Sequence, residues 1–198
     1  MTRLLGLLLA GGRSNRMRTD KAALSYGARP QLAEAFDLLA RHVDEAWISV
    51  RADQVGERLR AAYPQIVDCT PGIGPIAGII AAQARHPDAA WLIVACDLPQ
   101  LDGATLEDLK SGRDARRLAT AFASAVDGLP EPLCAIYEPA SREAILAHVA
   151  AGRDCPRKFL MTHDVLLLVL ARPAALANAN TPQDVQAARA ALASRGAA

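Results

Sequence analysis

Short apolar runs alternate along the chain with amphipathic stretches, and this alternation constrains the fold more than any other feature. Residues 4–10 and 90–95 contain no charged side chain, which is typical of strands buried on both faces of a parallel sheet. Residues 31–43 instead place Leu32 and Leu39 on one helical face. Alternating strands and helices predict an α/β fold with a mainly parallel central sheet flanked by helices.

The same pattern predicts where the elements lie. We expect strands at residues 4–10, 46–50, 65–67, 90–95, 118–125, 133–138 and 165–170, and helices at 31–43, 53–62, 74–84, 105–110, 141–151, 156–161 and 182–194. No linker divides the chain, so residues 1–198 are expected to form a single domain with a frayed tail at 195–198. Ligands of such sheets bind beyond the carboxyl ends of the strands, which points to the loops after Leu9, Val67 and Ala95.

Composition excludes several classes of function. The formal net charge of +1 and the aromatic content of 4% argue against a nucleic-acid-binding protein. The four cysteines are widely spaced and form no Cys-x-x-Cys pair, as expected for reduced thiols in a cytoplasmic protein. The apolar run at residues 4–10 is too short to span a bilayer, so no membrane association is expected.

Two glycines and a group of cations follow the first predicted strand. Gly11 and Gly12 allow the backbone to approach a ligand closely and expose N–H groups. The spacing matches neither the Gly-x-Gly-x-x-Gly of dinucleotide-binding proteins nor a P-loop, and a tight turn with solvated charges is the alternative. Cations suited to phosphate oxygens come next, at Arg13, Arg16, Arg18 and Lys21. We therefore interpret this segment as a phosphate-binding loop.

Carboxylates follow two further predicted strands. Asp97 comes closely after the strand at 90–95, where a hard oxygen ligand suits a Mg²⁺ ion carrying a polyphosphate. Taken alone, an aspartate before a loop is also a common helix cap. Asp68 follows the strand at 65–67 and precedes Gly74 in a glycine-rich segment. Those glycines either admit a flat ligand or pack a helix against the sheet.

The segment before the last predicted helix contains two asparagines. Thr181 and Asp184 are expected to form a capping box, with Pro182 in the first helical turn. This interpretation gives Asp184 a structural role. It leaves the amides of Asn178 and Asn180 to bind polar ligand atoms.

Together these segments resemble a known family. Five motifs occur in order: Leu-Ala-Gly-Gly-Arg-Ser-x-Arg-Met-x-x-Asp-Lys-Ala from residue 9, Gly-Pro-x-Ala-Gly-Ile from 74, Cys-Asp-x-Pro from 96, Pro-Leu-x-Ala-x-Tyr from 132 and Asn-x-Asn-Thr-Pro-x-Asp from 178. The chain resembles the molybdenum cofactor guanylyltransferases, the molybdopterin-guanine dinucleotide biosynthesis protein A type of nucleotidyltransferase. The resemblance implies a single-domain, Rossmann-like nucleotidyltransferase fold.

The resemblance also implies an activity and a set of site residues. The reaction would transfer GMP from GTP to the phosphate of molybdopterin with the help of Mg²⁺, in a monomer that serves molybdoenzyme-maturation proteins. Lys21, Asp97 and Arg16 would be catalytic, and Asp97 would bind the metal. The nucleotide and acceptor would contact Leu9, Ala10, Gly11, Gly12, Arg13, Lys21, Asp68, Gly74, Asp97, Asn178 and Asn180, with Pro132 and Leu133 on the molybdopterin side.

The motifs of this chain also bear on the choice of base, and at two positions they differ from those of the family. Related cytidylyltransferases tend to have Leu-Ala-Ala-Gly where this chain has Leu-Ala-Gly-Gly, which favours guanine. Arg18 stands where the family usually has glycine, and Arg51 where it often has asparagine, so one nucleoside contact differs. The alternatives are a nucleotidyltransferase that uses CTP or another acceptor, and a protein that binds nucleotide without turnover.

Overall fold

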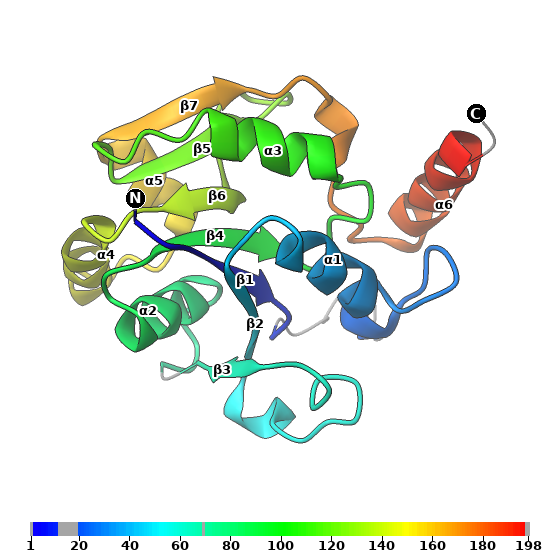
Figure 1. Ribbon diagram of the computed structural model, residues 1–198, viewed down its shortest axis with the longest axis horizontal. Helices are drawn as coiled ribbons and strands as arrows, with labels where there is room; N and C mark the ends of the chain where they lie inside the picture. The colour runs from blue at the N-terminus through cyan, green and yellow to red at the C-terminus, as the bar shows by residue number, and fades with distance from the viewer. Residues whose placement is uncertain (1, 12–19, 69, 197–198) are drawn as a thin grey trace.

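The computed structural model describes residues 2–11, 20–68 and 70–196, and its centre is a seven-stranded sheet in the order β3-β2-β1-β4-β6-β5-β7 (Figure 1). Among the described residues, every neighbouring pair of strands is parallel except the two pairs that involve β6. The predicted mainly parallel sheet is therefore confirmed. The strands are β1 (Leu4–Leu9), β2 (Glu45–Val50), β3 (Gln65–Val67), β4 (Ala90–Ala95), β5 (Ala119–Ala123), β6 (Pro130–Tyr137) and β7 (Val165–Val169).

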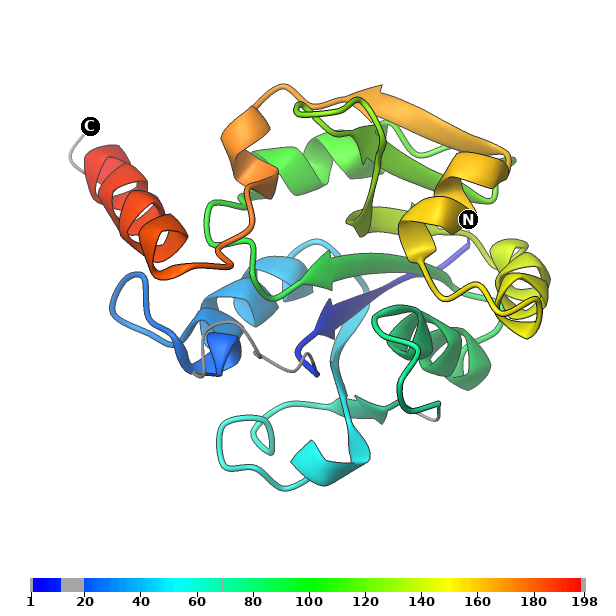
Figure 2. The ribbon, with the colours of Figure 1, turned by 180° about the vertical axis from the view of Figure 1, so that it is seen from behind.

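Helices cover both faces of this sheet (Figures 1 and 2). One buried apolar cluster joins the sheet to α1 and α3, and the other joins it to α2, α4 and α5. No helix in the described part of the chain has both the length and the apolar character needed to cross a membrane. The helices are α1 (Gln31–Ala40), α2 (Ile76–Arg85), α3 (Gly103–Ser111), α4 (Ser141–Ala150), α5 (Pro156–Thr162) and α6 (Pro182–Gly196), with short 3-10 turns η1 (Lys21–Ala23), η2 (Ala52–Gln54) and η3 (Pro173–Leu176).

The side chains of β1 explain why its sequence is apolar throughout. Leu4 and Leu8 pack in the cluster of α1 and α3, whereas Leu5 and Leu7 pack in the cluster of α2, α4 and α5. Successive residues of a strand face opposite sides, so a strand covered on both sides has no polar face. Each fully buried leucine contributes roughly 1.5–3 kcal/mol.

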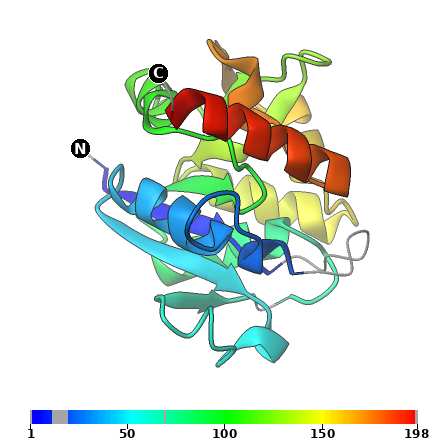
Figure 3. The same cartoon turned by 90° about the vertical axis from the view of Figure 1, so that its right-hand side faces the viewer.

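The order of the strands places a crevice beside β1. The chain runs from β1 to β2 and β3 on one side, and then returns to pair β4 with the other side of β1. Leu9 and Ala95 are partners in this parallel pair, so β1 and β4 end at the same edge. Figure 3 shows α6 and η1 at this carboxyl edge. The predicted position of the site therefore coincides with the point where the strand order reverses.

The structure corrects the helix predicted at residues 53–62. This segment contains only η2 followed by turns. The Gln54 side chain accepts a hydrogen bond from the Arg51 N–H at 3.1 Å, and Gly56 has a φ of +86°, a left-handed conformation that a helix does not accommodate. Similarly, α2 begins at Ile76 rather than at residue 74, because Gly74 has a φ of +70°.

Candidate active site

A cavity of about 980 Å³ lies beside the carboxyl ends of β1 and β4. Its volume is at the upper end of the range of about 300–1,000 Å³ that is usual for small-molecule sites. The remaining wall comes mainly from the segment after β2 and the segment before α2. The predicted site residues that line this cavity are Leu9, Ala10, Gly11, Lys21, Asp68, Gly74 and Asp97.

Lys21 connects three segments that are distant in the sequence. Its Nζ donates to Asp97 Oδ2 at 2.9 Å and also to Asn180 Oδ1. The Asp97 carbonyl accepts from the Ala179 N–H at 3.0 Å, which holds the asparagine segment against the end of β4. The structure therefore brings two predicted catalytic side chains together with one of the two predicted asparagines.

Asp184 has the structural role that the sequence predicts. Its Oδ2 accepts from the N–H groups of Asn180 and Thr181 at 2.9 and 2.8 Å, and the Thr181 hydroxyl accepts from the Asp184 N–H at 3.2 Å. These bonds lower the pKa of Asp184, with the one from the Asn180 N–H contributing most. The capping box thus orients the backbone of Asn180 beside Lys21.

Asp68 also lines the cavity, next to Gly11. Its Oδ1 accepts from the hydroxyl of Ser49, in β2, at 2.6 Å. Burial raises the pKa of Asp68, and the Ser49 hydrogen bond and the Arg51 charge partly offset that effect. Ser49 was not predicted as a site residue, because an isolated serine in a strand gives no sequence signal.

The glycine-rich segment packs a helix against the sheet, one of the two roles left open by the sequence, and it also lines the cavity. Gly74 lines the cavity in a left-handed conformation. Gly78, in α2, packs so closely on the sheet that an added Cβ would lie 2.5 Å from Ser49 Oγ and 2.9 Å from Leu9 Cδ2. Gly78 therefore allows the helix to approach the two strands beneath the cavity.

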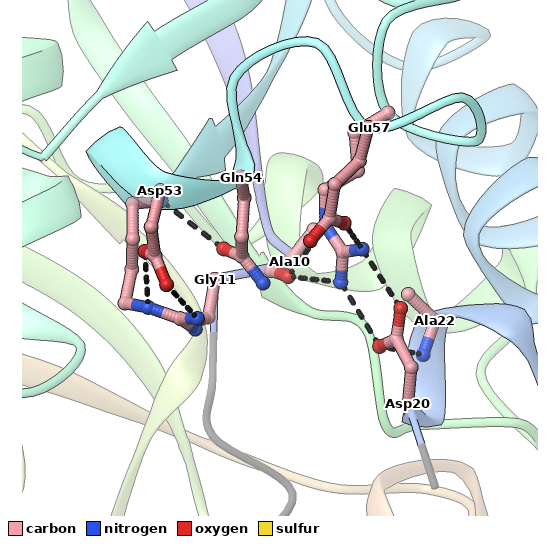
Figure 4. Close-up of polar contacts among 9 residues, drawn as sticks. Ala10, Gly11, Asp20, Ala22, Asp53, Gln54 and Glu57 are labelled. Carbon is pink, nitrogen blue, oxygen red and sulfur yellow. Dashed lines mark hydrogen bonds and ion pairs between the residues drawn. The ribbon is translucent and has the colours of Figure 1, made fainter.

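Two arginines of the segment between β2 and β3 bind the backbone at the end of β1. Arg60 donates to the Ala10 carbonyl, and Arg51 donates to the Gly11 carbonyl and to both oxygens of Asp53 at 3.0 Å. Figure 4 shows these two consecutive carbonyl groups between the acidic groups of Asp53 and Asp20. Sequence reasoning missed Arg60, because its charged neighbours resemble those of a solvated helix.

A second cavity, of about 90 Å³, shares the lining residue Leu133 with the first. Asn178 lines it, as do Pro132 and Leu133, the residues expected on the acceptor side. Arg157 also lines it and donates to Glu131 at 3.0 Å. Asn178 and Asn180 are therefore separated: Asn178 belongs to the smaller cavity and Asn180 to the Lys21 cluster.

Comparison with known proteins assigns this arrangement to a family. The model of the MobA-like NTP transferase domain matches residues 6–166. The chain belongs to this family. It is therefore a nucleotidyltransferase, and the family resemblance stated from the motifs is confirmed.

Relatives of this MobA-like chain cover nearly all of it. A molybdenum cofactor guanylyltransferase of Burkholderia orbicola is 34% identical over 93% of this chain and 94% of its own length. A molybdenum cofactor biosynthesis bifunctional protein of Synechocystis is 34% identical over 92% of this chain, which spans 53% of that protein. The crystal structure of molybdopterin-guanine dinucleotide biosynthesis protein A from Archaeoglobus fulgidus is 22% identical, with a TM-score of 0.81 over 96% of this chain and 99% of that one, and it shares the fold.

Two other predictions for this MobA-like domain concern the loop after Gly11 and the cysteines. Gly12, Arg13, Arg16 and Arg18 lie outside the described residues, so their roles stay predictions. The described cysteines are free thiols, as predicted, and burial raises the pKa of Cys96 to about 12. The Cys96 thiol therefore stays protonated beside Asp97 and is not a nucleophile.

Proposed function

We propose that this nucleotidyltransferase is a molybdenum cofactor guanylyltransferase, which transfers GMP from GTP to the phosphate of molybdopterin and releases pyrophosphate. The observation that carries the proposal is the cluster of Lys21, Asp97 and Asn180, in which Lys21 and Asp97 line the large cavity. The large cavity has room for a nucleotide, and the smaller one continues toward Asn178. The relatives with this name at 34% identity support the same activity.

The reaction requires positioning of the reactants and neutralisation of charge rather than a strong base. An oxygen of the acceptor phosphate attacks the α-phosphorus of GTP and forms a new P–O bond. The bond from the α-phosphorus to the oxygen that bridges to the β-phosphate breaks, and pyrophosphate leaves with the electron pair. The attacking oxygen is already anionic, so the site only has to align it and offset the charge. The Lys21 ammonium is the described cation closest to Asp97 for this role.

The side chains of the cluster fit a Mg²⁺ ion. The carboxylate of Asp97 and the amide oxygen of Asn180 both bind the same ammonium group, so these two hard oxygen donors already converge on one cation. Among the described residues, no group of three or more His, Cys, Asp or Glu side chains could hold a metal. Mg²⁺ typically binds through one or two carboxylates plus substrate phosphates, and it would supply Lewis-acid polarisation of the phosphate oxygens.

Guanine fits the wall of the large cavity better than cytosine. The Asp68 carboxylate is a hydrogen-bond acceptor on this wall, and guanine offers adjacent N–H donors on one edge. Cytosine presents an acceptor within the corresponding edge, which would leave Asp68 incompletely paired. Such mismatches can cost large factors, and we expect about a 10²-fold preference because both nucleotides share the triphosphate contacts.

A competition experiment tests the proposal. Purified protein is incubated with molybdopterin, Mg²⁺ and equal concentrations of GTP and CTP, and both dinucleotide products are quantified. A large excess of the guanine product is expected. A product dominated by cytosine would overturn the guanylyl assignment, and absence of pyrophosphate release with either nucleotide would favour a binding protein without turnover.

The remaining expectations are proposals of the same kind. We propose that the enzyme acts as a monomer in the cytoplasm and delivers its product to molybdoenzyme-maturation proteins. Light scattering of the purified protein checks the first point, because a mass of twice 20.9 kDa would contradict it.

A further inference from the structure

Arg60 is a buried charged residue for which the reaction described above gives no role. Its side chain is 1% exposed, whereas that of Arg113, another ion-paired arginine, is 17% exposed. Arg60 is not among the described residues that line either cavity. A guanidinium withdrawn from water is stable only where several acceptors replace its hydration. The identity of those acceptors therefore indicates what Arg60 does.

The acceptors are the two ends of the segment that joins β1 to η1. Arg60 Nε and Nη2 donate to the Ala10 carbonyl at 3.2 and 2.9 Å. Nη1 and Nη2 form a fork on the Asp20 carboxylate at 2.7 and 2.9 Å. Nη1 also donates to Glu57 (Figure 4), whose side chain is 44% exposed. One side chain thus links Ala10 and Asp20, which are ten positions apart in the sequence.

Each of these ends precedes a residue that lines the large cavity. At the first end, the Ala10–Gly11 peptide is trans, so the Gly11 N–H points away from the carbonyl that Arg60 binds. At the second end, Asp20 Oδ1 accepts from the Ala22 N–H at 3.1 Å and caps η1, whose first residue is Lys21. Arg60 therefore acts on the position of Gly11 through Ala10, and on that of Lys21 through Asp20.

The charges at the second end favour a permanent ion pair. Burial opposes ionisation of Asp20, but the hydrogen bonds and the charge of Arg60 outweigh burial and hold the pKa of Asp20 below its ordinary value. Asp20 therefore remains a carboxylate at neutral pH. A planar guanidinium can bind this carboxylate and a carbonyl at the same time, whereas the single ammonium of a lysine cannot reproduce that geometry.

We propose that Arg60 is a positioning residue for the nucleotide: by holding Ala10 and Asp20 together, it fixes the spacing between Gly11 and Lys21 at the triphosphate end of the cavity. The proposal rests on the nucleotide-transfer function proposed above. Arg60 touches neither the substrate nor the reacting atoms. Its contribution is to order the binding groups before the nucleotide arrives, which reduces the entropy lost on binding.

This role predicts a selective loss of affinity in the Arg60→Lys variant. The variant keeps the buried charge but cannot hold both ends. Misalignment of one charge-assisted contact weakens triphosphate binding by about tenfold. Binding of the monophosphate should change less, because the base contacts near Asp68 do not depend on Arg60. KM for the triphosphate should rise with a smaller change in kcat, because the contacts are shared by the ground state and the transition state.

The experiment measures calorimetric dissociation constants for the mono- and triphosphate of the nucleoside that the wild type binds best, in the presence of Mg²⁺. Arg60→Lys should lower the ratio of the two constants, monophosphate over triphosphate, by about tenfold. Arg113→Lys changes another ion-paired arginine, bonded to Glu138 and not lining either cavity, and Glu57→Gln changes the solvent-side partner of Arg60; both should leave the ratio unchanged.

A second variant keeps the test decisive if Arg60→Lys does not fold. Asp20→Asn leaves Arg60 in place, weakens only its hold on the second end and should lower the same ratio. An unchanged ratio in a folded Arg60→Lys, or in Asp20→Asn alone, would overturn the positioning role. A wild type that binds CTP best would instead refute guanylyl transfer, and the Arg60 comparison would still be valid with CTP and CMP.

Discussion

Replacing Gly78 with alanine should disturb both the packing of α2 and the Asp68 side of the cavity. An added methyl group would lie 2.5 Å from Ser49 Oγ and 2.9 Å from Leu9 Cδ2. The end of the leucine side chain can move at little cost. The Ser49 hydroxyl can move only by giving up its 2.6 Å hydrogen bond to Asp68.

The expected magnitude follows from these contacts. Loss of a hydrogen bond to a charged group costs about 1.5–3 kcal/mol. Alanine in place of glycine stabilises a helix by roughly 0.5–1 kcal/mol, which offsets part of that loss. We therefore expect Gly78→Ala to lower the free energy of unfolding by about 1–2 kcal/mol. Asp68 would also lose the partner that orients it, so nucleotide binding should weaken.

Urea denaturation and calorimetric titration with GTP measure the two effects. Gly27→Ala is the control, because an added Cβ there meets nothing within 4 Å, and its unfolding free energy should stay within about 0.5 kcal/mol of the wild type. In a Ser49→Ala background the same Gly78→Ala change should cost about 1 kcal/mol less. A Gly78→Ala variant at least as stable as the wild type would refute this reasoning.

Three further predictions concern charged groups. Asp97→Asn should lower the rate of pyrophosphate release by roughly 10³-fold, several kcal/mol of barrier, while leaving the fold intact; wild-type turnover would contradict the metal assignment. Lys21→Ala should weaken GTP binding in calorimetry more than Arg3→Ala, whose partner is the exposed Glu45, whereas equal losses would point to a general charge effect. Burial, aided by nearby positive charge, holds the pKa of His148 below its ordinary 6.5. The free energy of unfolding should therefore fall as the pH drops below about 6.5, and His148→Leu should remove this part of the pH dependence in denaturation experiments.

The sheet and the position of the site could be predicted from local sequence patterns. The runs at residues 4–10 and 90–95 are apolar on both faces because helices cover both faces of the sheet, and the parallel topology places their ends together. Asp97 follows one of these ends, and Lys21 and Asp68 line the same cavity. Continuous apolar runs together with the rule for strand order were therefore sufficient to locate these residues at one edge of the sheet.

The residues that support the site could not be predicted in this way. Arg60 has acidic and basic neighbours at helical spacing, and only the turn at Gly56 and the approach of Ala10 and Asp20 show that it faces inward. Asn180 lies 159 positions from Lys21, so their contact is a property of the fold. The capping box at Thr181 was visible locally because it involves residues three positions apart.

The positions of the two arginines also change how base recognition is understood. The carbonyl groups of Ala10 and Gly11 already accept hydrogen bonds from Arg60 and Arg51. They therefore have less capacity to accept hydrogen bonds from the N–H groups of a base. Asp68 does not have this restriction, because Ser49 binds only its Oδ1. The departure at Arg51 thus alters the backbone wall rather than filling the place of a base-binding amide. We infer that the choice between guanine and cytosine depends on Asp68 more than on the glycines after β1, from which the sequence predicts guanine.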